Sequence, residues 1–530
     1  MLKPLLILLL AAFFVTTAKS AEPEDLFPYR MRMGVNHAGV SPWASGVYFA
    51  NAMKMARPFY TTGDTPQPFR NLDAHLYPKS VPEGGLQALV LNAYFPSGEY
   101  VLAWEGDAEL TLEPSDSQAG RVELVSAKPN RMVYRVDPKG YFHVKLHSMD
   151  SEQPLRNLRL WLPGLEDAGP WNPAYLEACA PFGVYRFMNF MATNRSEVAA
   201  WSDRPTPDQL TYFVPSPLRD QHVPRGVPLE WLIELCNVMK ADPWFTLPHQ
   251  ATDIHVRSFA EMVNGRLDPV RTVYVEYSNE IFNPAFSQRD YAIRKARERG
   301  LDEGEADVSD GDLVARFYGL RATEIFQAFR DVYGVNSDAV VGVVTMGFRH
   351  ERHLHEAEAL LSYRDHHKHF DAMAYAPYCG VGIGNRFDLP FSEMDEEDLM
   401  AQLIREQAIQ IRAELERAKA VSDKYLLPLL AYEGGQHLSL FGGAIPDKHR
   451  ERFRDLVVAA NRHPLMENFY WHHLRDWYAT TDGVYCHFVL VAPPTPGYYW
   501  GLKEYPGQPL DEAPKARPFW ELSRNGRFFK

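Results

Sequence analysis

Eight short apolar segments recur along the chain, each too short to be a helix of ordinary length. They are residues 33–36, 184–188, 244–247, 273–277, 340–344, 372–376, 427–431 and 484–489. Continuous apolar runs of this length are typical of parallel strands that are buried on both faces. Amphipathic stretches with helical spacing lie between several of them, at residues 229–240, 314–333, 396–420 and 448–461. Strand and helix alternating about eight times predict an α/β protein, a (β/α)8 barrel.

One interval is too long for a single crossover, because the first strand ends near residue 36 and the second begins near residue 184. Between residues 86 and 162 the apolar positions alternate with polar ones, and Gly and Pro interrupt the pattern. This period of two is typical of antiparallel strands. We therefore expect the barrel to start in residues 22–71, to carry an inserted antiparallel β-sandwich in residues 72–165, and to continue through residues 166–530. Tyr94, Tyr100 or Trp104 of the sandwich could bind sugar, although alternating aromatic residues in strands are more often core.

The segment 202–228 holds six prolines and follows the second predicted strand directly. Proline fixes φ and lacks a backbone donor, so we expect neither helix nor sheet in this segment. Loops at the C-terminal ends of barrel strands are where barrel enzymes build their sites. The sequence therefore predicts that this loop forms one wall of a cleft.

The N-terminus has the pattern of a secretory signal peptide. Lys3 precedes an apolar run over residues 5–15, and small residues precede the acidic segment that begins at residue 22. A membrane anchor is the alternative, but a run of this length is short for a membrane span. We expect residues 1–21 to be removed and the mature protein to be periplasmic or extracellular, without a membrane. The four cysteines, at positions 179, 236, 379 and 486, match no CxxC spacing, so buried free thiols are expected, with a disulfide as the alternative.

Charge and motifs exclude several classes of function. The net charge is −13 and no basic run is long enough to follow a phosphate backbone, so nucleic acid is not an expected partner. The chain contains no HExxH, no GxSxG and no GxGxxG motif. We therefore expect no metal and no nucleotide cofactor. The oligomeric state does not follow from the sequence.

Two glutamates stand where predicted strands end. The fourth strand runs into Ser278-Asn279-Glu280, and the seventh runs into Tyr432-Glu433-Gly434. Strands four and seven lie on opposite sides of an eight-stranded barrel, so the two side chains should converge across its C-terminal mouth. Cleavage of a glycosidic bond needs such a pair, one acid to protonate the departing oxygen and one carboxylate to attack the anomeric carbon.

These two strand endings resemble those of clan A glycoside hydrolases, a group of retaining enzymes on (β/α)8 barrels. The chain looks most similar to a bacterial set labelled cellulose-binding or cellulase-like, over residues 31–56 and 168–502. The resemblance implies that Asn279 holds the sugar 2-hydroxyl, that Glu280 is the acid/base and that Glu433 is the nucleophile.

Other residues match the clan less specifically. The resemblance implies that Arg186 lies near the nucleophile, that His249 lines the cleft and that Tyr378 donates a hydrogen bond to the nucleophile. Trp201 and Trp500 lie near strand ends, where sugar faces stack on aromatic rings, and a structural role is the alternative for both.

The chain also departs from the clan pattern. Ala376 stands where many members have a histidine, and the tryptophan customary in strand eight has no clear counterpart. Two functions therefore stay open. One is an exported retaining glycosidase acting on a β-linked polysaccharide or oligosaccharide, and the other is a non-catalytic carbohydrate-binding protein on the same barrel. The presence of both glutamates favours the enzyme.

Overall fold

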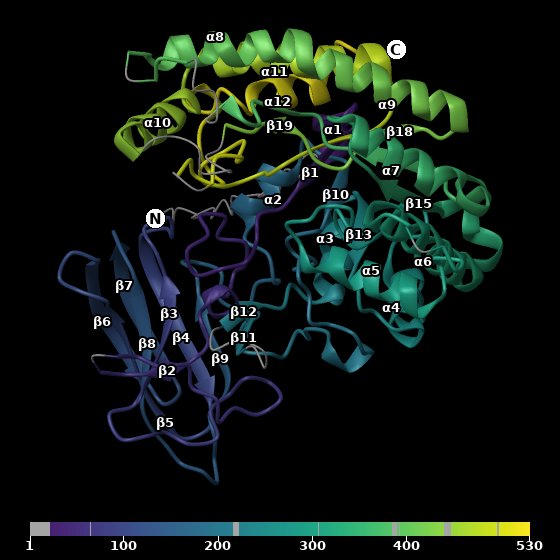
Figure 1. The fold of residues 1–530 in the computed structure, drawn as a ribbon. Helices are drawn as coiled ribbons and strands as arrows, with labels where there is room; N and C mark the ends of the chain where they lie inside the picture. The colour runs from purple at the N-terminus through teal and green to yellow at the C-terminus, as the bar shows by residue number, and fades with distance from the viewer. Residues whose placement is uncertain are drawn as a thin grey trace, which may run out of the picture.

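The computed structural model describes residues 22–63, 65–215, 222–305, 307–383, 389–391, 393–438, 447–495 and 498–529. In these residues eight parallel strands form a closed barrel (Figure 1). The strands are β1 (Met33–Asn36), β10 (Val184–Arg186), β13 (Asp242–Leu247), β14 (Val273–Tyr277), β15 (Val340–Thr345), β16 (Ala372–Tyr375), β18 (Leu429–Ala431) and β20 (Tyr485–His487). β1 pairs with both β10 and β20, which closes the barrel. Each strand falls on one of the predicted apolar segments, and the (β/α)8 fold is confirmed. The predicted signal peptide, residues 1–21, lies outside the described residues.

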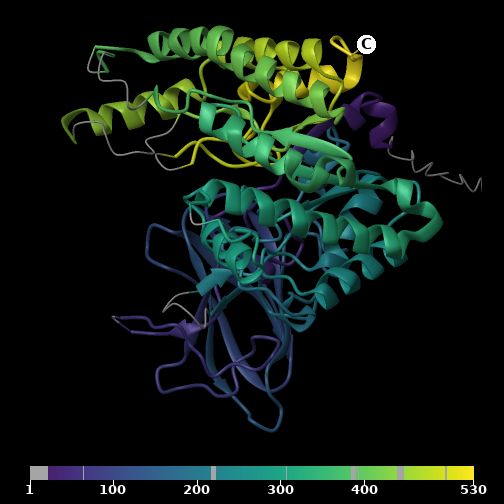
Figure 2. The same ribbon diagram turned by 45° about the vertical axis from the view of Figure 1, so that its right-hand side comes forward.

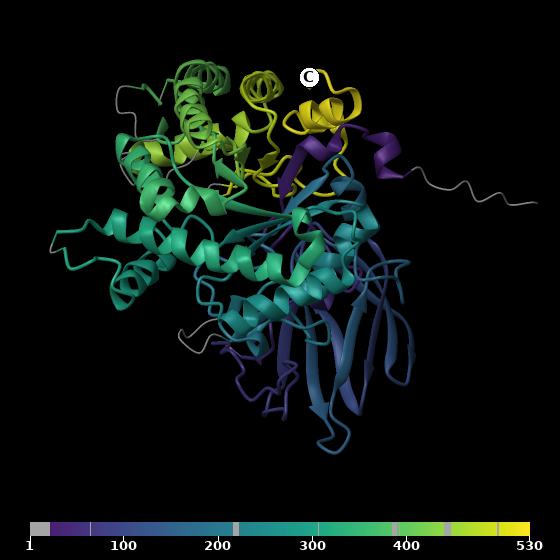
Figure 3. The same cartoon turned by 90° about the vertical axis from the view of Figure 1, so that its right-hand side faces the viewer.

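Helices connect the strands and surround the barrel (Figure 2). They are α2 (Pro173–Cys179), α3 (Leu229–Met239), α4 (Asp253–Arg266), α5 (Ser287–Glu298), α6 (Asp310–Tyr333), α7 (Glu351–Ser362), α8 (Glu396–Glu406), α9 (Arg412–Tyr425), α10 (Asp447–Ala460), α11 (Leu465–Thr480) and α12 (Arg517–Asn525). The amphipathic pattern identifies α3, α6, α8 with α9, and α10. At the other end of the chain, α1 (Pro23–Leu26) lies beside α12 (Figure 3). None of the described helices is long and apolar enough to cross a membrane.

The inserted domain consists of two four-stranded antiparallel sheets, with strand orders β2-β3-β8-β5 and β6-β7-β4-β9. Its strands are β2 (Tyr60–Thr61), β3 (Leu86–Leu91), β4 (Gly98–Glu105), β5 (Ala108–Pro114), β6 (Gly120–Lys128), β7 (Arg131–Pro138), β8 (Phe142–Met149) and β9 (Arg156–Trp161). β2 lies before residue 72, the predicted start of the domain. The sequence does not reveal this strand because two residues are too few to show alternation. The chain enters and leaves the domain at one place, where Leu162 N donates to Ala50 O over 2.9 Å. Tyr100 and Trp104 are buried in this domain, and Tyr94 is 39% exposed.

The proline-rich segment after β10 differs from the expectation. β11 (Phe213–Pro215) and β12 (His222–Pro224) pair as an antiparallel hairpin, and η3 (Trp201–Asp203) is a 3₁₀ turn. The prediction of neither helix nor sheet is therefore wrong. A two-stranded ribbon tolerates proline because positions at its outer edge need no N–H donor.

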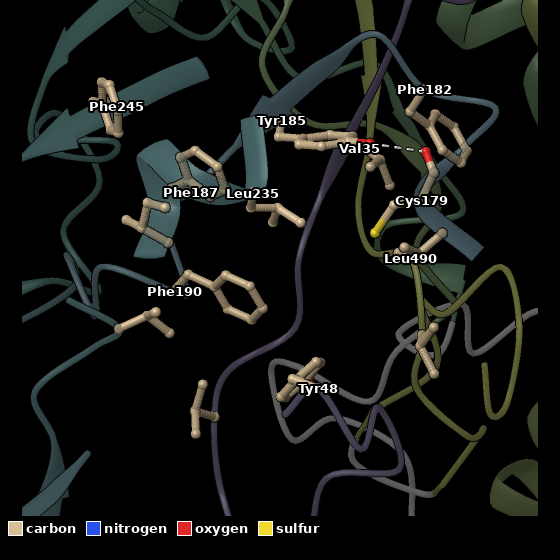
Figure 4. Close-up of a cluster of buried hydrophobic side chains, with 14 of the residues drawn as sticks. Val35, Tyr48, Cys179, Phe182, Tyr185, Phe187, Phe190, Leu235, Phe245 and Leu490 are labelled. Carbon is tan, nitrogen blue, oxygen red and sulfur yellow. Dashed lines mark hydrogen bonds between the residues drawn. The ribbon is translucent and has the colours of Figure 1, made fainter. Parts of the chain in front are cut away.

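Barrel residues point alternately toward the helices and into the barrel, as the period of a strand requires. Outward side chains such as Val35 and Tyr185 pack with Leu235 of α3, and Tyr185 OH donates to Cys179 O over 3.1 Å (Figure 4). Inward side chains near the start of the strands form a separate apolar cluster, which includes Val184, Trp244, Val343, Leu430 and Cys486. All four cysteines are free and buried, as predicted. Toward the C-terminal ends of the strands the inward positions become polar.

Gly34 supplies a test of this packing. It faces β20, where a Cβ atom would overlap the Cys486 sulfur. We expect Gly34→Ala to lower the free energy of unfolding by about 1–3 kcal/mol, the range for overpacked cores. Adding Cys486→Ala should recover part of that loss, because it removes the overlapping atom. Chemical denaturation measures both effects, and a Gly34→Ala protein of unchanged stability would contradict this packing.

Candidate active site

Arg186 stands at the end of β10 and its side chain is fully buried inside the barrel. Its Nε and Nη2 atoms donate to the two oxygens of Glu276, each over 2.9 Å. Nη1 donates to Glu433 Oε1 over 2.8 Å and to Asn36 Oδ1 over 3.1 Å. Nη2 also donates to Asn279 Oδ1 over 2.7 Å. One guanidinium therefore joins the ends of four barrel strands.

Glu276 was not identified from the sequence because it lies within an apolar strand. It follows the inward residue Tyr274 by two positions, so it also points into the barrel, and Trp244 Nε1 donates to its Oε2 over 2.8 Å. A signal was present: a single carboxylate at an inward position must find a buried partner, since an unpaired buried charge is very costly. Arg186, inward at the end of β10, is that partner.

Glu433 follows β18 and is only 5% exposed. Its second oxygen accepts a hydrogen bond from Tyr378 OH over 2.8 Å, at the start of β17 (Tyr378–Cys379). Burial raises the pKa of Glu433 to about 7, although the Arg186 charge and the Tyr378 hydrogen bond lower it, and the nearby Glu280 raises it further. Arg186 and Tyr378 therefore hold this carboxyl in place, but they do not cancel the effect of burial on its ionisation.

Glu280 lies across the barrel mouth, three residues beyond β14. Its Oε1 accepts from Tyr432 OH and its Oε2 accepts from Asn283 Nδ2, each over 2.7 Å. Both Ser278 and Glu280 have left-handed backbone, with φ of 61° and 41°. Such strain in residues other than glycine is concentrated at functional sites, where the surrounding structure maintains it. Tyr432 immediately precedes Glu433. The end of β18 therefore contacts Glu280 through Tyr432 and also supplies the second carboxyl, that of Glu433.

A cavity of about 390 Å³ borders Glu280, Tyr378 and Tyr432. It lies over the C-terminal ends of β14, β15, β16 and β18, where residues from the following loops complete its wall. The largest of these contributions comes from the loop after β15, which includes Arg349. Arg349 is paired with Glu414 over 3.1 Å. In the described part of the chain, no three potential metal ligands of the His, Cys, Asp or Glu type lie together.

The other predicted binding residues are distributed differently. His249 packs edge-on against Tyr291, with ring centroids 5.1 Å apart, and burial lowers its pKa to about 4. Trp201 packs against His255 and borders a different, smaller cavity. Trp500 is 7% exposed and belongs to an apolar cluster against which Tyr378 packs. Of the residues described, neither Trp201 nor His249 lines the cavity beside Glu280.

The fold and this site define a (β/α)8-barrel protein with two carboxyl groups, from β14 and β18, in one mouth. No family model matches the chain, and no curated protein matches it. Its structure is similar to that of an α-L-arabinofuranosidase from Thermotoga maritima, with a TM-score of 0.41 and 12% identity over 68% of this chain. The matched part spans 65% of that enzyme.

Two further solved structures are similar in the same way. A family 51 α-L-arabinofuranosidase from Bifidobacterium longum has a TM-score of 0.43 and 10% identity, over 67% of each chain. A β-galactosidase from the psychrophilic Marinomonas ef1 has a TM-score of 0.35 and 9% identity, over 67% of this chain and 58% of that one.

The pairing of Arg186 with Glu276 can be tested by stability. Arg186→Met would leave two buried carboxyls without their cation, and we expect it to lower the free energy of unfolding by about 3–5 kcal/mol. Adding Glu276→Gln should recover part of this loss, because it removes one of the two unpaired charges. Urea denaturation provides the measurement, and a loss below about 1 kcal/mol for Arg186→Met would contradict a buried ion pair.

Proposed function

We propose that this protein is an exported retaining glycoside hydrolase of clan A type that cleaves a β-linked polysaccharide or oligosaccharide. Glu280 would be its acid/base and Glu433 its nucleophile. The observation that carries the proposal is the pair of contacts at the end of β18. Tyr432 donates to Glu280, while the adjacent Glu433 is held by Arg186 and Tyr378. The two carboxyls therefore belong to a single site.

The proposed reaction has two steps. Glu433 attacks the anomeric carbon as the bond to the leaving oxygen breaks, and Glu280 gives its proton to that oxygen. Water then attacks the same carbon, Glu280 takes a proton from this water, and the bond between the sugar and Glu433 breaks. Glu276 holds two N–H groups of Arg186, so the guanidinium cannot follow Glu433 during attack. One oxygen of Glu433 stays fixed on Arg186 while the carboxyl reacts.

Asn279 makes contacts that the resemblance does not describe. Its amide oxygen accepts from Arg186, and its Nδ2 donates to Asn194 Oδ1 over 3.0 Å. The Nδ2 amide carries two N–H groups and this contact uses one, so a 2-hydroxyl held by Asn279 would accept a hydrogen bond from the other.

Removal of each glutamate tests the roles. Glu433→Ala should abolish cleavage of every substrate, since no covalent intermediate can form. Glu280→Ala should be slow on natural glycans, yet it should still release a burst of phenol from an aryl glycoside whose leaving group needs no proton. Stopped-flow absorbance of the phenol measures the burst.

A burst from the Glu433 variant alone would reverse the two roles, and full activity in both variants would place the site elsewhere. A panel of β-glucans, xylan, mannan and galactan, assayed for reducing-sugar release, tests the wild-type chain. Binding to one of these glycans without release would favour the non-catalytic alternative.

The pH dependence of kcat/KM tests the surroundings of Glu433. With a pKa of about 7, Glu433 loses its charge as pH falls through neutrality, so the acid limb should lie near pH 7. Tyr378→Phe removes a donor that favours the ionised form, so the limb should move to higher pH, by about one unit. Glu276→Gln leaves the Arg186 charge less compensated, so the limb should move to lower pH.

Trp244→Phe is the matched control for Glu276→Gln. It removes a neutral donor to Glu276 and leaves every charge in place, so the acid limb should remain near pH 7. Shifts of the same sign in Tyr378→Phe and Glu276→Gln would contradict the assignment of this limb to Glu433.

A further inference from the structure

A second cavity, of about 220 Å³, lies beside the site on the β10 side of the barrel mouth. Residues of the segment 188–198, Gly39 and residues 223–225 line it. One of these residues, Asn194, accepts hydrogen bonds from Asn279 Nδ2 over 3.0 Å and from Gln288 Nε2 over 2.8 Å. Gln288 Nε2 also donates to Asn279 O over 2.9 Å. A single side chain therefore separates this cavity from Asn279.

Two arginines in this lining form no ion pair with the carboxylates that the structure describes. Arg195 Nη2 donates to Ala285 O over 3.0 Å, and Arg225 Nη1 donates to Asp203 O over 3.1 Å. Both acceptors are backbone carbonyls, and neither arginine forms an ion pair with any described carboxylate. Glu197 also lines the cavity. The charged side chains of the lining are therefore two arginines and one glutamate. Each guanidinium retains further N–H donors for a ligand.

The backbone that carries Arg195 is strained. Ala192 and Arg195 both have left-handed conformation, with φ of 49° and 56°. Hydrogen bonds from outside the loop hold it, since Arg195 N donates to Gln288 Oε1 over 3.2 Å. Backbone strain of this kind costs free energy and is concentrated at functional sites.

We propose that this cavity binds an anionic substituent of the glycan, the carboxylate of a uronic acid or a sulfate ester, on a sugar adjacent to the cleaved bond. The identity of the ligand as a glycan depends on the proposed function. The planar guanidinium fits both anions with paired hydrogen bonds. A neutral sugar would leave both charges uncompensated. The net charge of −13 repels a densely charged polymer, so we infer a glycan with separate acidic residues.

The test compares three β-linked disaccharides that differ only at C6 of one ring, which carries a hydroxymethyl group, a carboxylate or a sulfate ester. Calorimetric titration uses the full-length Glu433→Gln protein, which does not turn the probes over. We expect an acidic probe to bind about tenfold tighter than the neutral one, the effect of a charged hydrogen bond. The tighter of the two acidic probes then identifies the anion.

Arg195→Gln and Arg225→Gln, each in the same background, should remove this preference. Arg257→Gln is the matched control, because it makes the same change in net charge on α4, where Arg257 pairs with Glu261 over 3.0 Å. It should keep the preference. Equal affinity for all three probes, or a preference that survives both cavity variants, would overturn the inference.

The outcome is distinct from that of the proposed function. A wild-type chain that cleaves neutral aryl glycosides but shows no acidic preference would be a hydrolase without this anion site. A chain that binds the acidic probe through Arg195 and Arg225 but cleaves no glycoside would retain the anion site, and the hydrolase proposal would fall.

Discussion

The buried guanidinium of Arg186 is the interaction on which the rest of the site depends. An arginine has five N–H groups, and all five are used here, on Glu276, Glu433, Asn36 and Asn279. Because these partners come from the ends of β1, β14 and β18, and Arg186 itself from β10, the charge network fixes the relative positions of four strand ends as well as the carboxyl that we propose as nucleophile. The apolar lower barrel could be repacked in many ways, whereas this polar layer permits one arrangement of its partners.

The same network sets the electrostatics of the mouth. One cation faces two carboxylates, so Glu433 shares the Arg186 charge with Glu276 and receives only part of its stabilisation. Burial then outweighs that part and raises the pKa of Glu433 to about 7. Glu276 therefore has two opposite effects on Glu433. It holds Arg186 in position for that carboxyl, and it weakens the field that would keep the carboxyl ionised.

The sequence was sufficient for the barrel and for the two glutamates at the mouth, and insufficient for what supports them. Apolar runs identify buried parallel strands directly, and a carboxylate at the end of such a run is conspicuous. Glu276 is hidden because the residues around it are apolar, and its partner lies 90 positions away in the chain. Helices such as α4 and α5 escape detection because their polar faces dominate the pattern. Trp201 shows a further limit: it lies on a loop after a barrel strand, yet the loop turns it toward His255 rather than toward Glu280.

The arginines around the mouth fall into two groups with different electrostatic roles. Arg186 and Arg349 are bound to carboxylates, so their charges are already balanced within the protein. Arg195 and Arg225 are bound to backbone carbonyls, and neither pairs with a carboxylate in the described part of the chain. An acidic sugar next to Glu433 would raise the pKa of that carboxyl further unless a cation screened it. Two unbalanced arginines beyond Asn279 would supply that screening, so binding of an acidic glycan and ionisation of Glu433 would be compatible in the same mouth.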